Sequence, residues 1–362
     1  MKKLKVYLQY PLVRSDSQYY KSILDNSPKE VEYYESKKNA GMSVSARRIG
    51  LMRRLKIILR WIFNKTKLPL PSAFYVGGKE KYDLIHCAHC LCLNKHPWVA
   101  DIEFYSQMWG GVKLTKARKF LVKKLLLRKS CKKIMPWTEI TKQQILKEFP
   151  EVKNKIEKVS YAMPSPKFEK VISKKISLLF TARYFDGKGG FDAVEVINTL
   201  TKKYSNVYGT IISNIPKEIL EKYSKNKKIK FYGLMPYEKI VKEIYPFSDI
   251  YIYPGYTDSF GFTFVEAQAF GLPVVTVEGF ARDELIEDGK TGYIISRKGY
   301  KDYYHPNKKI IEELLKKTEY LIKNKNKRRS MSLRGIKEVR EGKFSLNKRN
   351  SQLKKIYEES IK

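Results

Sequence analysis

Two carboxylates, Asp258 and Glu266, stand eight residues apart around a turn that contains Gly261. The pattern predicts a short helix from Thr263 to Phe270, which Gly-Leu-Pro then stops. A turn that opens a helix leaves backbone N–H groups available to ligand oxygens. Ionised Asp and Glu only accept hydrogen bonds, and sugar hydroxyls donate them. The pattern therefore indicates a site for a sugar nucleotide, although Glu266 alone is equally compatible with an ordinary first-turn acid that stabilises the helix dipole.

A second group of polar residues lies in the loop after a predicted buried strand, Ile176 to Ala182. At the carboxyl edge of a parallel sheet such a loop is where ligands bind. Arg183 offers a planar fork for phosphate oxygens and Lys188 a mobile point charge, so together they can neutralise a diphosphate. The alternative is a solvated basic loop in a basic protein.

The run from Asp258 to Val275 resembles the C-terminal motif of family 4 glycosyltransferases of the GT-B fold. In that family the motif reads Glu, seven residues, Glu, a short helix and Gly-Leu-Pro-Val-Val. The spacing of Arg183 and Lys188, the run 284–293 and the strand and turn 230–234 are also similar. One departure stands out, because Asp258 is one methylene shorter than the usual Glu and can meet a different sugar hydroxyl.

The resemblance implies a retaining transfer of a sugar from a nucleotide-diphosphate sugar to a glycan or lipid-linked acceptor, with no cofactor and no metal. It also implies roles for single residues: Arg183 and Lys188 at the diphosphate, Glu266 at the ribose, Asp258 with the amides of Phe260, Gly261 and Phe262 at the donor sugar, and Gly233 and Leu234 near the base.

The N-terminal half resembles the family more weakly, through the segment 83–92, which matches a strand that ends in a histidine. Either His86 or His89 can contact the donor sugar or orient an acceptor hydroxyl, and each is equally compatible with a histidine satisfied at a strand end. Asp16 and Glu103 are weaker candidates on the acceptor side, and Glu103 is also compatible with a salt-bridged acid at a strand end.

Three cysteines crowd into the same segment, at Cys87, Cys90 and Cys92, and the fourth is Cys131. Cys-x-x-Cys beside histidine can bind zinc, but structural sites usually draw on a second ligand pair. We therefore favour packing of the thiols as small apolar groups.

The order of predicted elements defines the fold class. Strands and helices alternate from end to end, which favours α/β domains with parallel sheets. With the resemblance, this predicts a GT-B protein with two Rossmann-like domains facing across a cleft. We expect an acceptor-side domain over residues 1–165, a nucleotide-sugar domain over 166–344, and a final helix, 345–362, that crosses back to the first domain.

The formal charge of +36 is extreme for 362 residues. Basic residues concentrate between Ala46 and Lys133, and two leucine-rich basic segments, 46–67 and 113–133, suit an anionic membrane surface. The alternative for 46–67 is a surface helix whose apolar stripe packs on its own sheet. No apolar run approaches a membrane span, so we expect a cytoplasmic protein, peripheral to the cytoplasmic face of the membrane through these segments.

Three rival hypotheses remain open. A basic protein that binds nucleic acid accounts for the charge, but no nucleic-acid-binding motif accompanies it, so we expect no specific nucleic acid partner. A sugar-nucleotide epimerase would share the GT-B fold and fits the motif from Asp258 to Glu266 less well. A membrane-bound homologue without activity is the third.

Overall fold

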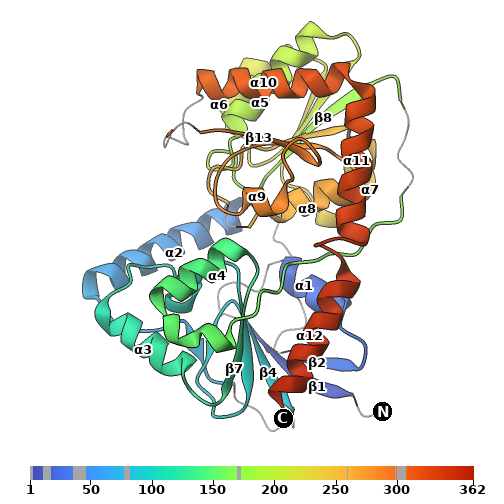
Figure 1. The fold of residues 1–362 in the computed structure, drawn as a ribbon. Coiled ribbons are helices and arrows are strands. Elements are labelled where there is room, and N and C mark those ends of the chain that lie inside the picture. Colours follow the sequence, from blue (N-terminus) through green and yellow to red (C-terminus); the bar gives the residue numbers. More distant parts are fainter. Residues whose placement is uncertain are drawn as a thin grey trace. The chain divides into compact units, whose positions relative to one another are not determined.

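Two parallel sheets organise the chain in the computed structural model, which describes residues 3–10, 18–35, 46–76, 82–168, 173–258, 260–297, 299 and 307–362 (Figure 1). Contacts between residues divide the chain into two units. Unit 1 comprises Met1–Ala162 and Leu346–Lys362, and unit 2 comprises Met163–Ser345. Among the described residues, no helix combines the length and the apolar composition that crossing a membrane requires.

Unit 1 is built on a five-stranded sheet in which every pair of neighbouring strands is parallel. Its order is β2 (Val31–Glu35), β1 (Leu4–Gln9), β4 (Leu84–Ala88), β6 (Trp98–Ile102) and β7 (Cys131–Pro136). A small parallel pair joins β3 (Ala73–Phe74) to β5 (Leu91–Cys92). The α-helices are α1 (Gln18–Asp25), α2 (Ala46–Thr66), α3 (Lys116–Leu126), α4 (Glu139–Glu148) and α12 (Leu346–Ser360), with short 3-10 helices at Tyr105–Trp109 and Pro150–Lys155.

Successive residues of these strands point to opposite faces of the sheet, and the two faces carry two separate apolar clusters. One face packs against α12, through Val6, Val31, Leu84, Val99 and Met135 with Leu353, Ile356 and Tyr357. The other packs against α3 and α4, through Ile85, Trp98, Ala100 and Ile134 with Val122, Leu125, Leu126 and Ile145. Because both faces are covered, the central strands β4 and β6 are fully buried and mostly apolar. The last helix of the chain therefore covers one face of the sheet of the first unit (Figure 1).

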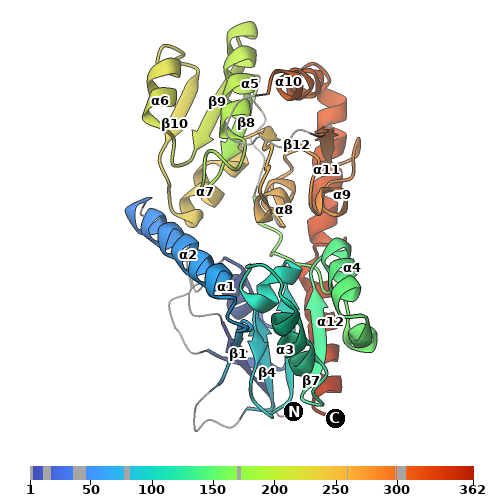
Figure 2. The same ribbon diagram turned by 90° about the vertical axis from the view of Figure 1, so that its left-hand side faces the viewer.

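Unit 2 contains a six-stranded parallel sheet. Its order is β10 (Ile229–Tyr232), β9 (Val207–Ile212), β8 (Ile176–Thr181), β11 (Ile250–Ile252), β12 (Val274–Val277) and β13 (Gly292–Ile295). Its α-helices are α5 (Gly190–Lys203), α6 (Lys217–Tyr223), α7 (Tyr237–Glu243), α8 (Phe262–Ala269), α9 (Arg282–Leu285), α10 (Lys308–Lys323) and α11 (Lys325–Arg340), with a 3-10 turn at Tyr245–Phe247. Helix α5 packs beside α10, and α8 beside α11 (Figure 2).

Apolar runs in the sequence predict strands at 132–137, 207–213, 273–277 and 98–105. The first three lie close to β7, β9 and β12, and the fourth is shorter for a clear reason. The strand expected from Trp98 to Tyr105 ends at Ile102. There the side chain of Gln107 accepts hydrogen bonds from the backbone N–H groups of Glu103 and Phe104, and the chain turns into a 3-10 helix. The edge strands β2 and β13 and the helices α10 and α11 were not predicted.

Candidate functional site

The loops that follow the neighbouring strands β8 and β11 are joined by hydrogen bonds. The backbone N–H of Gly255 donates to the carbonyl of Lys188 at 3.0 Å, and that of Thr257 donates to Gly187 at 3.1 Å. Gly189 precedes α5 with φ 75°, and a Cβ there would lie 2.4 Å from Pro254. The absence of a side chain at Gly189 therefore lets the two loops approach closely.

This approach brings Lys188 into contact with Asp258. The ammonium group of Lys188 pairs with Oδ1 of Asp258, and the guanidinium of Arg282 lies 3.8 Å from Oδ2. Asp258 is only 8% exposed. The residue expected at the diphosphate and the residue expected at the donor sugar therefore neutralise each other in this structure.

Glu266, the second carboxylate of the motif, lies on α8 and is 5% exposed. The hydroxyl of Tyr245 donates to its Oε2 at 2.9 Å. Burial raises the pKa of Glu266 to about 7, although hydrogen bonds from Tyr245 and Tyr237 act in the opposite direction. Gly261 caps the N-terminus of α8 with φ 91°. Glycine suits this position because a Cβ there would lie 2.4 Å from the ring of Phe264.

The other donor-side candidates lie along the same sheet. Arg183 is half-buried in the loop after β8, and Gly233 and Leu234 directly follow β10. Phe260 is buried, and its ring centroid lies 5.6 Å from that of Phe262. Because all strands of this sheet are parallel, their carboxyl ends share one edge, where ligands of open α/β sheets bind.

Arg282 was not predicted, and it is the most buried charge near Asp258, at 1% exposure. It donates a hydrogen bond to the carbonyl of Gly255, and its guanidinium lies 4.5 Å from the ring centroid of Phe264. The sequence offered one signal for Arg282. It is a cation shortly after β12, and residues that follow a parallel strand lie at the carboxyl edge of the sheet.

In unit 1, His86 is fully buried and uses both ring nitrogens within the protein. Its Nδ1 lies 2.6 Å from the hydroxyl of Tyr357, and its Nε2 lies 2.9 Å from Oδ2 of Asp101. Burial lowers the pKa of His86 to about 3, so the imidazole is neutral. One nitrogen then donates to Asp101 while the other accepts from Tyr357. Both ring nitrogens of His86 therefore have partners within the protein in this structure.

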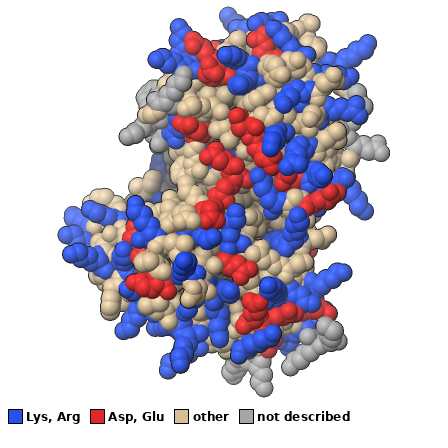
Figure 3. Space-filling model, viewed as in Figure 1, with Lys and Arg blue, Asp and Glu red and all other residues tan. Residues whose placement is uncertain are grey.

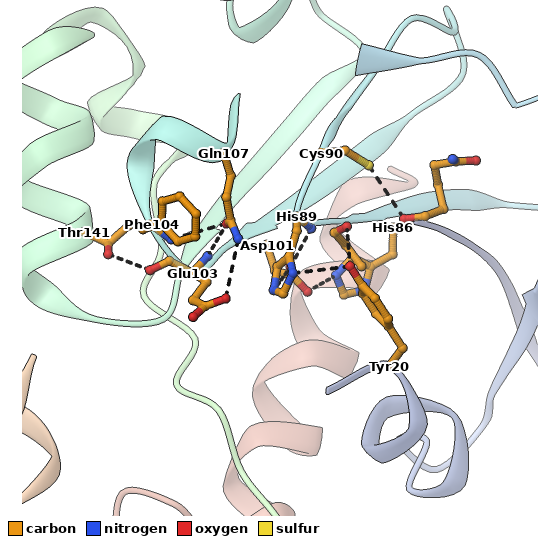
Figure 4. A network of polar contacts seen from close by, with 11 residues as sticks. Tyr20, His86, His89, Cys90, Asp101, Glu103, Phe104, Gln107 and Thr141 are labelled. Atoms are coloured by element: carbon orange, nitrogen blue, oxygen red, sulfur yellow. Dashed lines mark hydrogen bonds and ion pairs between the residues drawn. The ribbon is translucent and has the colours of Figure 1, made fainter. Parts of the chain in front are cut away.

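His89 shares the carboxylate of Asp101 (Figure 4). Its backbone N–H donates to Oδ1 of Asp101 at 3.0 Å, and its Nδ1 lies 3.3 Å from the hydroxyl of Tyr20. The ring stacks on Tyr19 with a centroid distance of 5.0 Å, and the backbone has φ 63°. Asp101 thus links the two candidate histidines, although the sequence had drawn attention only to Glu103, two residues later.

The remaining acceptor-side candidates are Glu103 and Asp16. Glu103 is half-buried, its Oε2 accepts from Gln107 at 3.5 Å, and its carbonyl accepts from the hydroxyl of Thr141 at 2.8 Å. Glu103 also acts electrostatically on Asp101, whose pKa burial raises well above its usual range. Asp16 lies outside the described residues.

The four cysteines are buried free thiols that pack in the cluster of unit 1 facing α3 and α4. Within the described part of the chain, no group of three or more His, Cys, Asp or Glu side chains is arranged to hold a metal ion.

Comparison with known proteins relates this geometry to a family. Residues 164–337 match the family described as glycosyl transferases group 1. The chain is 25% identical over 233 residues to an uncharacterized 41.2 kDa protein in the cps region of Klebsiella pneumoniae, over 62% of this chain and 60% of that protein. It is 27% identical over 141 residues to the alpha-monoglucosyldiacylglycerol synthase of Acholeplasma laidlawii, over 38% of this chain and 33% of that one. The alignments thus span less than two thirds of either relative.

The fold is similar to solved structures over nearly the whole chain. The structure of Anabaena Alr3699/HepE in complex with UDP-glucose matches with a TM-score of 0.64 at 11% identity, over 98% of this chain and 100% of that one. The expected α/β class and GT-B fold are confirmed by this likeness and by the two parallel sheets.

Proposed function

Through residues 164–337 the chain belongs to the group 1, or family 4, glycosyl transferases, and from that premise we propose that it moves a sugar from a nucleotide-diphosphate sugar to a glycan or lipid-linked acceptor. The sugar is transferred with retention of anomeric configuration. An acceptor hydroxyl attacks the anomeric carbon on the face from which the diphosphate leaves. The bond from that carbon to the phosphate oxygen breaks, and the acceptor proton passes to the departing diphosphate.

One observation carries the proposal, the contact between Lys188 and Asp258 at the carboxyl edge of the family-matched sheet. A cation for the diphosphate and a carboxylate for the sugar hydroxyls must be neighbours, since the two parts of the donor are covalently joined. Arg183 adds a second cation after the same strand, and Glu266 places a buried acceptor for ribose hydroxyls on the following helix. Fixed cations near a leaving diphosphate stabilise its developing charge.

Thermal-shift measurements with UDP-, GDP-, ADP- and dTDP-linked sugars test donor binding. A ligand that binds only the folded state raises the unfolding temperature, so at least one sugar nucleotide must do so. The sugar transfer or donor hydrolysis that follows should be lost in Arg183→Ala and Glu266→Ala. If no sugar nucleotide stabilises the protein, the transferase proposal fails, and unchanged activity in both variants refutes the site assignment.

For the acceptor we propose a lipid-linked or membrane-surface glycan, reached through α2. This helix contains no acidic residue, and large apolar side chains along it face solvent, among them Ile57, Ile58 and Trp61, with Trp61 60% exposed. An apolar stripe of 46–67 packed on its own sheet would have buried Leu55 and Ile58, which are instead exposed. The name of the Acholeplasma laidlawii relative, a diacylglycerol glycosylating enzyme, supports the same acceptor class.

Basic side chains accompany this apolar surface. Figure 3 shows Lys and Arg distributed over the visible face of both units, and over α2 and α3 they alternate with uncharged atoms. The C-terminal end of α2 is anchored by Arg118, which is buried and donates hydrogen bonds to the carbonyls of Phe63, Leu68 and Lys113. A helix that combines Lys or Arg with exposed Trp and Ile suits the headgroup region of an anionic bilayer.

Co-sedimentation with vesicles of phosphatidylglycerol and phosphatidylcholine tests this surface. The double variant Ile58→Asp with Trp61→Asp should lose binding about tenfold or more. Leu333→Asp, at an equally exposed position on α11, is the matched control and should bind like the original protein. Equal binding by both variants contradicts a role for α2.

A further inference from the structure

We propose that Arg282 is a positioning residue for the donor sugar, because it remains as the counter-ion of Asp258 when Lys188 turns from Asp258 to the diphosphate. The inference rests on the proposed function and deepens it. Arg282 stands outside the family motif residues that we identified, and its role follows from its burial and its neighbours.

The surroundings of Arg282 leave its charge incompletely balanced. Its guanidinium is 1% exposed, and among the described residues its Nε and Nη1 have no hydrogen-bond partner. It faces the carbonyl of Gly255, the ring of Phe264 and the carboxylate of Asp258. A buried cation is costly unless it is paired and hydrogen-bonded. The buried guanidinium therefore favours a stable counter-ion, and Asp258 is the carboxylate that faces it.

The carboxylate of Asp258 is also incompletely balanced. Its Oδ1 is held by Lys188, and its buried Oδ2 lies 3.8 Å from Nη2 of Arg282, while the phenol of Tyr253 also interacts with this carboxylate. A sugar hydroxyl can donate to Oδ2 of Asp258, while Arg282 holds that carboxylate in place as its counter-ion. The pair thus has the chemistry to recognise a hydroxyl of the donor sugar.

Lys188 is the more mobile partner, with a compact charge on a flexible stem, and its side chain is 16% exposed against 1% for Arg282. A diphosphate carries more negative charge than one carboxylate and competes for Lys188. Once Lys188 moves, Asp258 would be a buried carboxylate without a counter-charge if Arg282 were absent. Diphosphate binding should therefore depend on Lys188, and the added affinity due to the sugar should depend on Arg282.

The test compares the affinities for UDP and UDP-glucose, or for the corresponding pair that the thermal-shift panel selects, by titration calorimetry. The dissociation constant for UDP divided by that for UDP-glucose measures how much the sugar adds to the affinity. In Arg282→Met we expect this ratio to fall about tenfold while the affinity for the diphosphate alone changes less than about threefold, the scale of one charge-assisted hydrogen bond. Arg282→Lys should restore the ratio to within about threefold.

Two further variants separate positioning from a general structural role. Asp258→Asn should lose the sugar contribution by itself, and adding Arg282→Met to it should change the ratio no further. Arg328→Met is the matched control, because Arg328 holds the carbonyls of Leu321 and Ile322 at the end of α10 and should affect stability alone.

An equal loss of affinity for UDP and UDP-glucose in Arg282→Met, or an unchanged ratio, overturns the proposal. If Arg282→Met does not fold, Arg282→Lys decides: loss of the sugar contribution as complete as in Asp258→Asn also overturns it, and retention supports it. If the original protein binds neither compound of any pair, the proposed function itself has failed, which is a distinct result.

Discussion

Two buried titratable residues have pKa values moved in opposite directions by the same cause. Burial disfavours the charged form, so it raises the pKa of the acid Glu266 to about 7 and lowers that of the base His86 to about 3. At neutral pH, Glu266 is therefore close to half protonated, whereas His86 is neutral. A group near its pKa can change charge when a ligand arrives, and this distinguishes the donor-side candidate from the histidine.

Replacing Glu266 by Gln should change the pH dependence of folding. The folded protein retains a proton on Glu266 that the unfolded chain releases above about pH 4.5, so its contribution to stability is full at low pH and is lost as pH rises through 7. Relative to the original protein, Glu266→Gln should gain on the order of 3 kcal/mol between about pH 4.5 and 7. Urea unfolding at several pH values measures this, with exposed Glu243→Gln as control.

The same variant tests the ribose contact. Ribose hydroxyls donate hydrogen bonds to a carboxylate, so the affinity for the sugar nucleotide should fall as the pH drops from 8 to about 6 in the original protein. In Glu266→Gln the affinity should be lower and independent of pH over this range. A pH dependence that persists in the variant would assign the titration to another group.

His86 should not titrate in the folded protein between pH 8 and 5. Its lowered pKa means that the unfolded chain takes up a proton below about pH 6.5 that the folded protein does not, so stability falls from that pH towards 3. NMR of the imidazole resonances, assigned with His86→Gln, measures the titration directly. Ring resonances of His86 that move with a midpoint near 6.5 would contradict the buried network.

At the scale of elements, two loops and one helix decide which residues meet. The loops after β8 and β11 are brought together by glycine at position 189 and by backbone hydrogen bonds, and this places Lys188 on Asp258. Helix α12 returns to the first sheet and places Tyr357 against His86. Its apolar residues pack on the sheet, while Tyr357 adds a polar contact within that core.

Tyr357→Phe should lower the free energy of unfolding by about 1–3 kcal/mol, the cost of leaving a buried partner unsatisfied. Its hydroxyl lies 2.6 Å from Nδ1 of His86 and 2.8 Å from the hydroxyl of Tyr33, and both contacts are lost. Glu359→Gln, on the exposed side of α12, is the control and should change stability little. An unchanged unfolding midpoint in Tyr357→Phe would mean that α12 is held by its apolar contacts alone.

At the scale of the whole molecule, the charge of +36 supplies long-range attraction without choosing a partner. Lys and Arg are scattered over the visible face of both units, among uncharged and acidic residues, and are not confined to the segments between Ala46 and Lys133 (Figure 3). Charge alone therefore does not separate a membrane from a nucleic acid. The exposed aliphatic residues of α2, Ile57 and Ile58, favour the membrane, because a nucleic acid backbone offers them no apolar environment.

Salt distinguishes these contributions. Raising the ionic strength from about 0.05 to about 0.5 M shortens the Debye length and should weaken binding to anionic vesicles about tenfold or more. A residual affinity due to apolar insertion should persist in the original protein and disappear in Ile58→Asp with Trp61→Asp. RNA binding should vanish at high salt in both. Salt-resistant, sequence-specific RNA binding would instead support the nucleic-acid hypothesis.

The sequence by itself determined the features that depend on local spacing. The α/β class follows from alternating strands and helices, and the donor motif lies within one turn and one helix, so the interval from Asp258 to Glu266 was readable without the structure. The strands also lie near their predicted bounds, because buried parallel strands are short apolar runs. Helices α10 and α11 were missed, and with them Arg328.

Only the tertiary structure decided which distant side chains meet. Lys188 and Asp258 are 70 residues apart, and His86 and Tyr357 are 271 apart. These contacts depend on strand order, on the close approach of two loops and on the return of α12, none of which local patterns encode. The structure likewise showed that both ring nitrogens of His86 contact partners within the protein and that Arg282 lies beside Asp258. Burial decides these roles, and burial is a property of the packed molecule.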